Sequence, residues 1–259
     1  MKKFLYLVAF LFTFAIAGYA AEEKLIILDS SLSMGQPVNG VPKYAIAIQA
    51  AKKQLQKMNP SERIGLRTIG LPLDSSVLTF LMNPDELCKA TQLTAPIKSY
   101  NFQNIESALD SIVPLGTTPL TYALDTAIKY DFSNGYHTKH IILITDGAES
   151  CDNNPCQYIR KLMSTRKDIV IDIIAIGVTN EELSQLKCLT DSTTGTIIQA
   201  NTTKQIEDAF GNLLNTNPSP NPSYQPKENF PLPAVTPQNY SFKNNSGITY
   251  KTYLYETYE

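Results

Sequence analysis

Short apolar runs rich in Ile, Val and Leu alternate with longer amphipathic segments along most of the chain. The runs are Leu25–Leu28, Ile64–Ile69, Ile141–Thr145, Ile169–Ile176 and Thr196–Gln199. Several are apolar at nearly every position, as expected of strands buried on both faces of a parallel sheet that helices cover. The alternation therefore predicts an α/β fold built on a mostly parallel, doubly wound sheet.

The segments between these runs carry apolar residues at helical spacing. In Lys43–Lys57 apolar residues recur every three or four positions, and Asn59-Pro60 follows as a stop signal. The same pattern predicts five further helices, at Asn104–Val113, Leu120–Tyr130, Cys156–Thr165, Glu181–Thr190 and Lys204–Leu214. A weaker run, Gln92–Ile97, predicts an edge strand, where Pro96 removes no required ladder donor.

The N-terminus has the pattern of a secretory signal. Lys2 and Lys3 precede the apolar run Phe4–Ala17, and Gly18 and Ala20 supply the small residues of a cleavage site. We predict a signal peptide over residues 1–20 and no stable membrane span after its removal, because the run is short. An uncleaved N-terminal anchor is the alternative. The mature protein is expected to be exported, whether periplasmic, cell-surface or secreted.

The composition changes after Leu214. In Asn215–Pro237 prolines recur among asparagines and serines, a composition that cannot form a packed core. Ile248–Tyr258 is rich in Tyr and Thr and has strand propensity, but an isolated strand has nothing to pair with. We predict one domain over residues 22–214 and, over residues 215–259, a linker with a Tyr-rich tail.

Four cysteines lie in the predicted mature chain: Cys88, Cys151, Cys156 and Cys188. An even number in an exported protein predicts two disulfides, for which three connectivities exist. The spacing favours pairing Cys151 with Cys156, which leaves Cys88 with Cys188. A zinc site is the alternative, but the chain has no close CxxC pair, and neither histidine lies at a ligand spacing from the cysteines.

Three predicted strand or loop ends carry oxygen side chains. The first strand leads into Asp29-Ser30-Ser31-Leu32-Ser33, where alternation directs Asp29, Ser31 and Ser33 to the same side. Thr118 precedes one predicted helix, and Asp146 follows the strand Ile141–Thr145. Open α/β sheets bind ligands at the carboxyl ends of their strands. Each motif alone could be a turn or a helix cap.

Taken together, these five residues form a set of hard oxygen ligands without sulfur or imidazole. Such ligands suit Mg²⁺, Mn²⁺ or Ca²⁺. Two carboxylates balance the charge of a divalent ion, while the hydroxyls add ligands without further negative charge. The ion could then accept one more acidic ligand from outside.

The pattern resembles the metal-ion-dependent adhesion site of the von Willebrand factor A domains, which combines Asp-x-Ser-x-Ser with a separate Thr and a separate Asp. The resemblance covers roughly residues 24–214, and the run from Asp146 to Cys156 is similar to exported bacterial members with cysteines there. It implies a six-stranded sheet with one antiparallel edge strand and helices on both faces. It also implies that the hydroxyls contact the ion, and that the aspartates act directly or through water. Leu71–Cys88 is extra or divergent relative to a compact member.

We therefore predict a metal-dependent protein-binding or adhesion module, loaded with Mg²⁺ or Mn²⁺ (Ca²⁺ being possible), that binds a partner's Asp or Glu. The alternatives are an interaction module with an idle metal site and a metal-dependent hydrolase. An enzyme is not expected, because the chain has no G-x-S-x-G elbow, P-loop or dinucleotide fingerprint. A net charge of −2 without a basic patch argues against nucleic acid as a partner. Cytoplasmic A-domain proteins that assist ATPases are a third class, against which the signal peptide argues.

Overall fold

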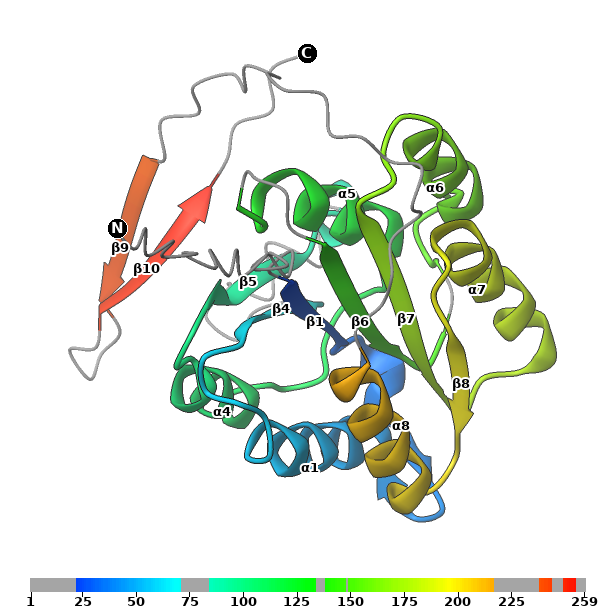
Figure 1. Ribbon diagram of the computed structural model, residues 1–259, viewed down its shortest axis with the longest axis horizontal. Coiled ribbons are helices and arrows are strands. Elements are labelled where there is room, and N and C mark those ends of the chain that lie inside the picture. The colour runs from blue at the N-terminus through cyan, green and yellow to red at the C-terminus, as the bar shows by residue number, and fades with distance from the viewer. Residues whose placement is uncertain are drawn as a thin grey trace, which may run out of the picture. The chain divides into compact units, whose positions relative to one another are not determined.

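A computed structural model describes residues 22–70, 84–133, 138–147, 149–216, 238–243 and 249–254 (Figure 1). The predicted signal peptide, most of Leu71–Cys88 and His137 lie outside the described residues. The chain divides into two compact units, residues 1–224 and residues 225–259. Within the described part, no helix has the length and apolar character needed to cross a bilayer.

The first unit contains a six-stranded sheet. Its strands, in spatial order, are β5 (Thr91–Lys98), β4 (Arg63–Ile69), β1 (Glu23–Asp29), β6 (Lys139–Thr145), β7 (Ile169–Ile176) and β8 (Ile197–Ala200). All neighbours are parallel except β5, which runs antiparallel to β4 at the edge. The α/β prediction and the single antiparallel edge strand are confirmed.

Helices cover both faces of this sheet (Figure 1). On one face lie α1 (Lys43–Leu55), α4 (Phe102–Asp110) and α8 (Thr203–Asn215); on the other lie α5 (Leu120–Tyr130), α6 (Pro155–Met163) and α7 (Asn180–Thr193). The alternation of the strands supplies both cores, since in β1 Ile26 and Leu28 face α1 while Leu25 and Ile27 face α5. All four side chains are fully buried, so the sheet is doubly wound as predicted.

A short hairpin that the sequence analysis did not anticipate lies between β1 and α1. After the 3-10 helix η1 (Leu32–Gly35), strands β2 (Pro37–Val38) and β3 (Val41–Pro42) pair antiparallel. The turn residues Asn39 and Gly40 have φ of 51° and 83°, and an Asn-Gly pair with two positive φ angles is the preferred two-residue hairpin turn. The signal was present as Val-Asn-Gly-Val.

Helix ends differ by a few residues from those predicted. The largest shifts are three residues, at the ends of α4 and α7, and α4 also begins at Phe102 rather than at Asn104. Asn101 is fully buried and donates from Nδ2 to the carbonyls of Ile64 and Pro96, which ties the start of this helix to β4 and β5. Residues 84–87 form one further short helix, α3 (Pro84–Leu87), just before Cys88.

The second unit contains a two-stranded antiparallel ribbon. Strand β9 (Gln238–Lys243) pairs with β10 (Thr249–Leu254), with Phe242 opposite Tyr250. The strand propensity of Ile248–Tyr258 corresponds to β10, and β9 supplies the pairing partner that the sequence analysis did not identify. The partner strand lies only a few residues upstream, in a segment to which the sequence analysis assigned no structure.

Candidate metal site

The two aspartates of the predicted site meet because their strands are neighbours. Strands β1 and β6 run parallel, with Leu28 opposite Ile144, so the residues that follow lie side by side at the carboxyl edge of the sheet. Asp29 is fully buried and Asp146 nearly so. Strand β1 lies between β4 and β6, so the strand order reverses at β1. Open α/β sheets bind ligands at the carboxyl ends of the strands at such a switch point.

Hydrogen bonds link four of the five predicted residues. The backbone N–H of Ser31 donates to Asp29 Oδ1 at 2.8 Å. The hydroxyls of Ser31 and Ser33 lie 3.0 Å apart, and Ser33 Oγ donates to Asp146 Oδ1 at 2.9 Å. Thr145, which the sequence analysis missed, donates its hydroxyl to Asp29 Oδ2 at 2.6 Å. The only signal for Thr145 was a polar residue at the end of an apolar strand.

Thr118 reaches this end of the sheet on a separate loop. Its backbone N–H donates to Ser150 Oγ at 2.7 Å, and its carbonyl accepts from Ser150 N at 3.1 Å. The interpretation of Thr118 as the cap of α5 is wrong, because the N-cap position is Pro119 and no side chain caps there. Among the described contacts, no direct hydrogen bond joins the Thr118 hydroxyl to the other four site residues.

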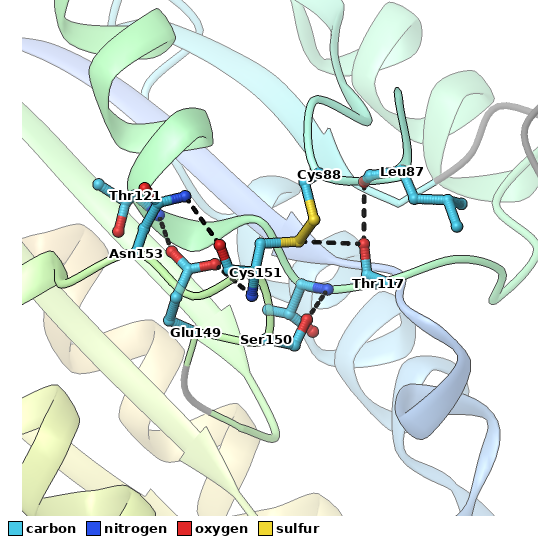
Figure 2. The surroundings of a disulfide bond; sticks show 9 residues. Leu87, Cys88, Thr117, Thr121, Glu149, Ser150, Cys151 and Asn153 are labelled. Carbon is cyan, nitrogen blue, oxygen red and sulfur yellow. Dashed lines mark hydrogen bonds between the residues drawn. A yellow bond between two sulfur atoms is a disulfide. The ribbon is translucent and has the colours of Figure 1, made fainter. Parts of the chain in front are cut away.

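A disulfide fastens the loop after Asp146 to the segment that follows α3, which contacts the loop of Thr118. Figure 2 shows Cys151 bonded to Cys88, with Thr117 beside them donating its hydroxyl to Leu87 O at 2.9 Å. Glu149 accepts from Cys151 N and, with its other oxygen, from Thr121 N at 2.7 Å in the first turn of α5. A carboxylate is favourable at a helix N-terminus. Both loops are therefore held together beside the site.

The disulfide pairing predicted from the spacing is wrong. The structure joins Cys88 to Cys151 and Cys156 to Cys188. Cys156 lies in the first turn of α6, against α7, where Cys188 is located, whereas Cys151 faces the segment after α3. The packing of α6 against α7 determined the pairing, and the short loop between Cys151 and Cys156 did not. All four sulfurs are bonded, so the alternative of a zinc site on the cysteines is excluded.

Comparison with known proteins identifies the fold family. Residues 25–212 match the family model of the von Willebrand factor type A domain, which is well over half of the chain. The chain belongs to the von Willebrand factor type A (vWA) family. It is 27% identical over 186 residues to the uncharacterized protein YwmC of Bacillus subtilis (strain 168), covering 71% of this chain and 79% of that protein.

Solved structures of similar fold include two pilus proteins. The pilus adhesin SpaC from Lactobacillus rhamnosus GG superposes with a TM-score of 0.55 at 13% identity, over 75% of this chain and 30% of SpaC. The vWF domain of the type V pili tip protein Mfa5 from Porphyromonas gingivalis superposes with a TM-score of 0.53 at 12% identity, over 76% of this chain and 95% of that domain. At these identities the likeness establishes the fold.

The electrostatics of the vWA site are set by two buried carboxylates. Burial raises the pKa of Asp29 to about 6; hydrogen bonds from Thr145 and Ser31 oppose this rise, and the charge of Asp146 adds to it. Asp146 is paired with Lys43, whose Nζ lies 2.9 Å from Asp146 Oδ2. Among the described residues, Lys43 is the basic side chain that forms an ion pair at this site.

The donor set of the vWA domain fits a hard divalent cation. Carboxylate and hydroxyl oxygens converge here, and their mutual hydrogen bonds place them within reach of one another. Within the described residues there is no cluster of three or more His, Cys, Asp or Glu that could hold a metal. Any ion at this edge would thus depend on the hydroxyls as well as on the two aspartates.

Apolar side chains are exposed around the site. Among the described residues four large hydrophobic side chains are exposed: Leu32 (66%), Val41 (44%), Val113 (45%) and Tyr100 (76%). Leu32 lies inside the Asp-x-Ser-x-Ser loop, Val41 in the adjacent hairpin, and Val113 just before the loop that meets Leu32 through Gly116. Tyr100 is at the opposite end, after β5. The first three, which we call the apolar rim, lie beside the site.

His140 lies at the amino end of the sheet, far from the aspartates along β6. It is fully buried, with Nδ1 2.8 Å from Glu22 and Nε2 2.7 Å from Asp172. His140 is thus an entry residue of β6, and Glu22 and Asp172 satisfy its ring nitrogens inside the fold.

Proposed function

We propose that this vWA domain is an exported protein-binding module whose site holds Mg²⁺ or Mn²⁺, and that the ion attracts an Asp or Glu of a partner protein. The observation that carries the proposal is the chain of hydrogen bonds from Asp29 through Ser31 and Ser33 to Asp146. It gathers hard oxygen ligands at the edge of the sheet where ligands of such folds bind.

The charges of the site support a cation. Asp29 and Asp146 are buried together, and burying unpaired carboxylates is costly. Lys43 provides one positive charge for the pair. The hydroxyls of Ser31, Ser33 and Thr118 would complete the ligand set without adding charge. A bound divalent ion would supply an attraction for a carboxylate oxygen of another molecule.

The surroundings of the site support a protein as that other molecule. Leu32, Val41 and Val113 expose apolar surface beside the polar centre, and protein interfaces combine an apolar area with a few oriented polar contacts. The similar folds of a pilus adhesin and a pili tip protein are consistent with such a role. Two disulfides agree with export, because disulfides persist in oxidising compartments.

Calorimetry of the domain with Mg²⁺, Mn²⁺ and Ca²⁺ tests the metal site. We expect one ion per chain, with binding lost in Asp146→Ala and weakened in Ser33→Ala, because each change removes an oxygen ligand or its support. Asp208→Ala is the matched control, since Asp208 forms an exposed pair with Lys204 on α8. Equal metal affinity in the wild type and Asp146→Ala would contradict the assignment.

Capture of partners from the envelope of the source organism tests the binding role. Immobilised wild type in Mg²⁺ is compared with the same protein in EDTA and with Ser33→Ala. We expect partners that are recovered only by the wild type with metal and are released by EDTA. The same partners in all three conditions would favour the alternative, an interaction module with an idle metal site. Turnover of a phosphoester or peptide library would instead favour a metal-dependent hydrolase.

A further inference from the structure

Lys43 places a positive charge inside the site. It is the first residue of α1, and its Nζ lies 2.9 Å from Asp146 Oδ2. The ion pair is largely shielded from water, with side-chain exposures of 12% for Lys43 and 1% for Asp146. Ion pairs in such surroundings are screened less than surface pairs. The ammonium therefore acts on this carboxylate with little solvent in between.

Three neighbouring loops hold Lys43 in this position. Its backbone N–H donates to Gln36 O at 3.1 Å, at the base of the β2–β3 hairpin. Its side chain passes over Gly177 at the end of β7, where an added Cβ would lie only 3.3 Å from Lys43 Cε. Asn201 joins these loops by accepting from Asn39 and from Gly177 N. A lysine held in this way differs from a freely moving surface lysine.

The sum of charges makes Lys43 a competitor of a divalent cation. Asp29 and Asp146 together carry two negative charges, of which Lys43 balances one. A divalent ion beside them would bring the positive charge to three against two, and like charges only a few ångströms apart repel strongly in a site of low polarity. An acidic side chain of a partner would restore the balance at three against three.

We propose that Lys43 is the internal counter-ion of the metal site, which lowers its affinity for a free divalent cation. The inference rests on the proposed function. In this arrangement the cation binds firmly only together with an acidic ligand, because the ligand supplies the missing negative charge. By thermodynamic reciprocity, the acidic ligand is bound firmly only with the cation.

Mg²⁺ calorimetry and thermal melting of Lys43→Met test this role. Methionine keeps most of the apolar stem and removes the charge. We expect Mg²⁺ to bind Lys43→Met about tenfold more tightly than the wild type, because the repulsion is gone. Without metal the variant should melt at a lower temperature than the wild type, because Asp146 has lost its partner, and Mg²⁺ should restore much of that loss.

Two further variants separate charge from folding. Lys43→Arg keeps the charge and should bind Mg²⁺ like the wild type. Lys53→Met is the matched control on the same helix, since Lys53 pairs with Glu207 away from the site, and it should also leave the affinity unchanged. Tighter binding in Lys53→Met as well would overturn a local role for Lys43.

The remaining outcomes distinguish this inference from the proposed function. If the wild type binds Mg²⁺ and Asp146→Ala does not, but Lys43→Met binds with equal or weaker affinity, the role of Lys43 is wrong and the metal site stands. If neither the wild type nor Lys43→Met binds Mg²⁺, both are wrong. Tighter binding confined to Lys43→Met supports the counter-ion.

Discussion

The two ends of the central sheet differ in how their buried acidic side chains are paired with basic ones. At the amino end the described acids have basic partners: His140 lies between Glu22 and Asp172, and Lys24 lies 2.7 Å from Glu62. At the carboxyl end Lys43 pairs with Asp146, and no ion pair of the described residues involves Asp29. Both ends are polar because strands end there. Among the described residues, the two buried aspartates of the carboxyl end thus have one positive charge against two negative charges.

The pKa values of the acids follow this difference. Burial would raise the pKa of Glu23, but hydrogen bonds from Ser133 and Arg63 outweigh it, and the pKa is lowered. At Asp29 the balance is reversed, and burial raises the pKa to about 6. The partners of Glu23 thus stabilise its charged form, whereas burial destabilises the charged form of Asp29. A buried carboxylate with a raised pKa is typical of a functional site.

The largest expected effect comes from the disulfides, one of which lies beside the site. Cys88→Ser/Cys151→Ser removes a bond that closes 63 residues, and Cys156→Ser/Cys188→Ser removes one that closes 32. Each should lower the free energy of unfolding by about 4 kcal/mol through chain entropy. Only the first should also weaken Mg²⁺ binding, by about tenfold, because it supports the loop of Thr118.

Urea denaturation and calorimetry, at a temperature where both variants are folded, measure these two quantities. The pair of variants is matched, since each loses one disulfide and gains two serines. An equal loss of Mg²⁺ affinity in both would show that the site depends on overall stability rather than on the Cys88–Cys151 bond.

The next largest effect is expected from breaking the pair of His140 and Asp172 at the amino end of the sheet. Asp172→Ala removes a partner of His140 and the acceptor for Thr196 N, and it should lower the free energy of unfolding by about 3 kcal/mol. Mg²⁺ affinity should not change, because the site lies at the other end of the strands. Asp208→Ala, an exposed control, should change stability by less than about 0.5 kcal/mol in the same urea titration.

A smaller effect is a pH dependence that originates at His140. Burial alone would lower the pKa of His140, but hydrogen bonds with Asp172 and Glu22 outweigh it, so the pKa is raised above 6.5. A raised pKa means that the charged form stabilises the fold. This contribution is complete below pH 6.5 and is lost as the pH rises through the folded-state pKa.

Denaturation of the wild type and His140→Gln across this pH range measures the contribution. The difference in unfolding free energy between them should be largest on the acidic side and should shrink as the pH rises. A difference that grows toward alkaline pH would contradict the assignment of a charged His140.

The smallest effect is expected from the C-terminal part. Removing residues 217–259 should change neither the melting temperature of the domain nor its Mg²⁺ affinity, because both hydrophobic cores and both disulfides are formed by residues 22–216. The truncation should instead weaken partner capture. A melting temperature far below that of the full chain would show that the C-terminal part belongs to the fold.

The sequence determined the sheet, its helices and the candidate ligands, because these depend on local patterns. The apolar runs that form β1, β6 and β7 are buried on both faces. Such burial requires apolar residues at nearly every position, and the sequence shows this pattern directly. Asp29, Ser31 and Ser33 follow from alternation at a strand end. The structure adds that these residues are linked to Asp146, the consequence of two strands becoming neighbours.

Only the tertiary structure decided which distant groups met. The spacing of Cys151 and Cys156 favoured a local disulfide, but packing of α6 on α7 brought Cys156 to Cys188 instead. No sequence pattern marked Lys43 as part of the site, whereas the structure places its side chain over Gly177 with its Nζ at Asp146. Pairings of this kind depend on how helices and loops pack in three dimensions, and a linear pattern records the residue types without recording their neighbours.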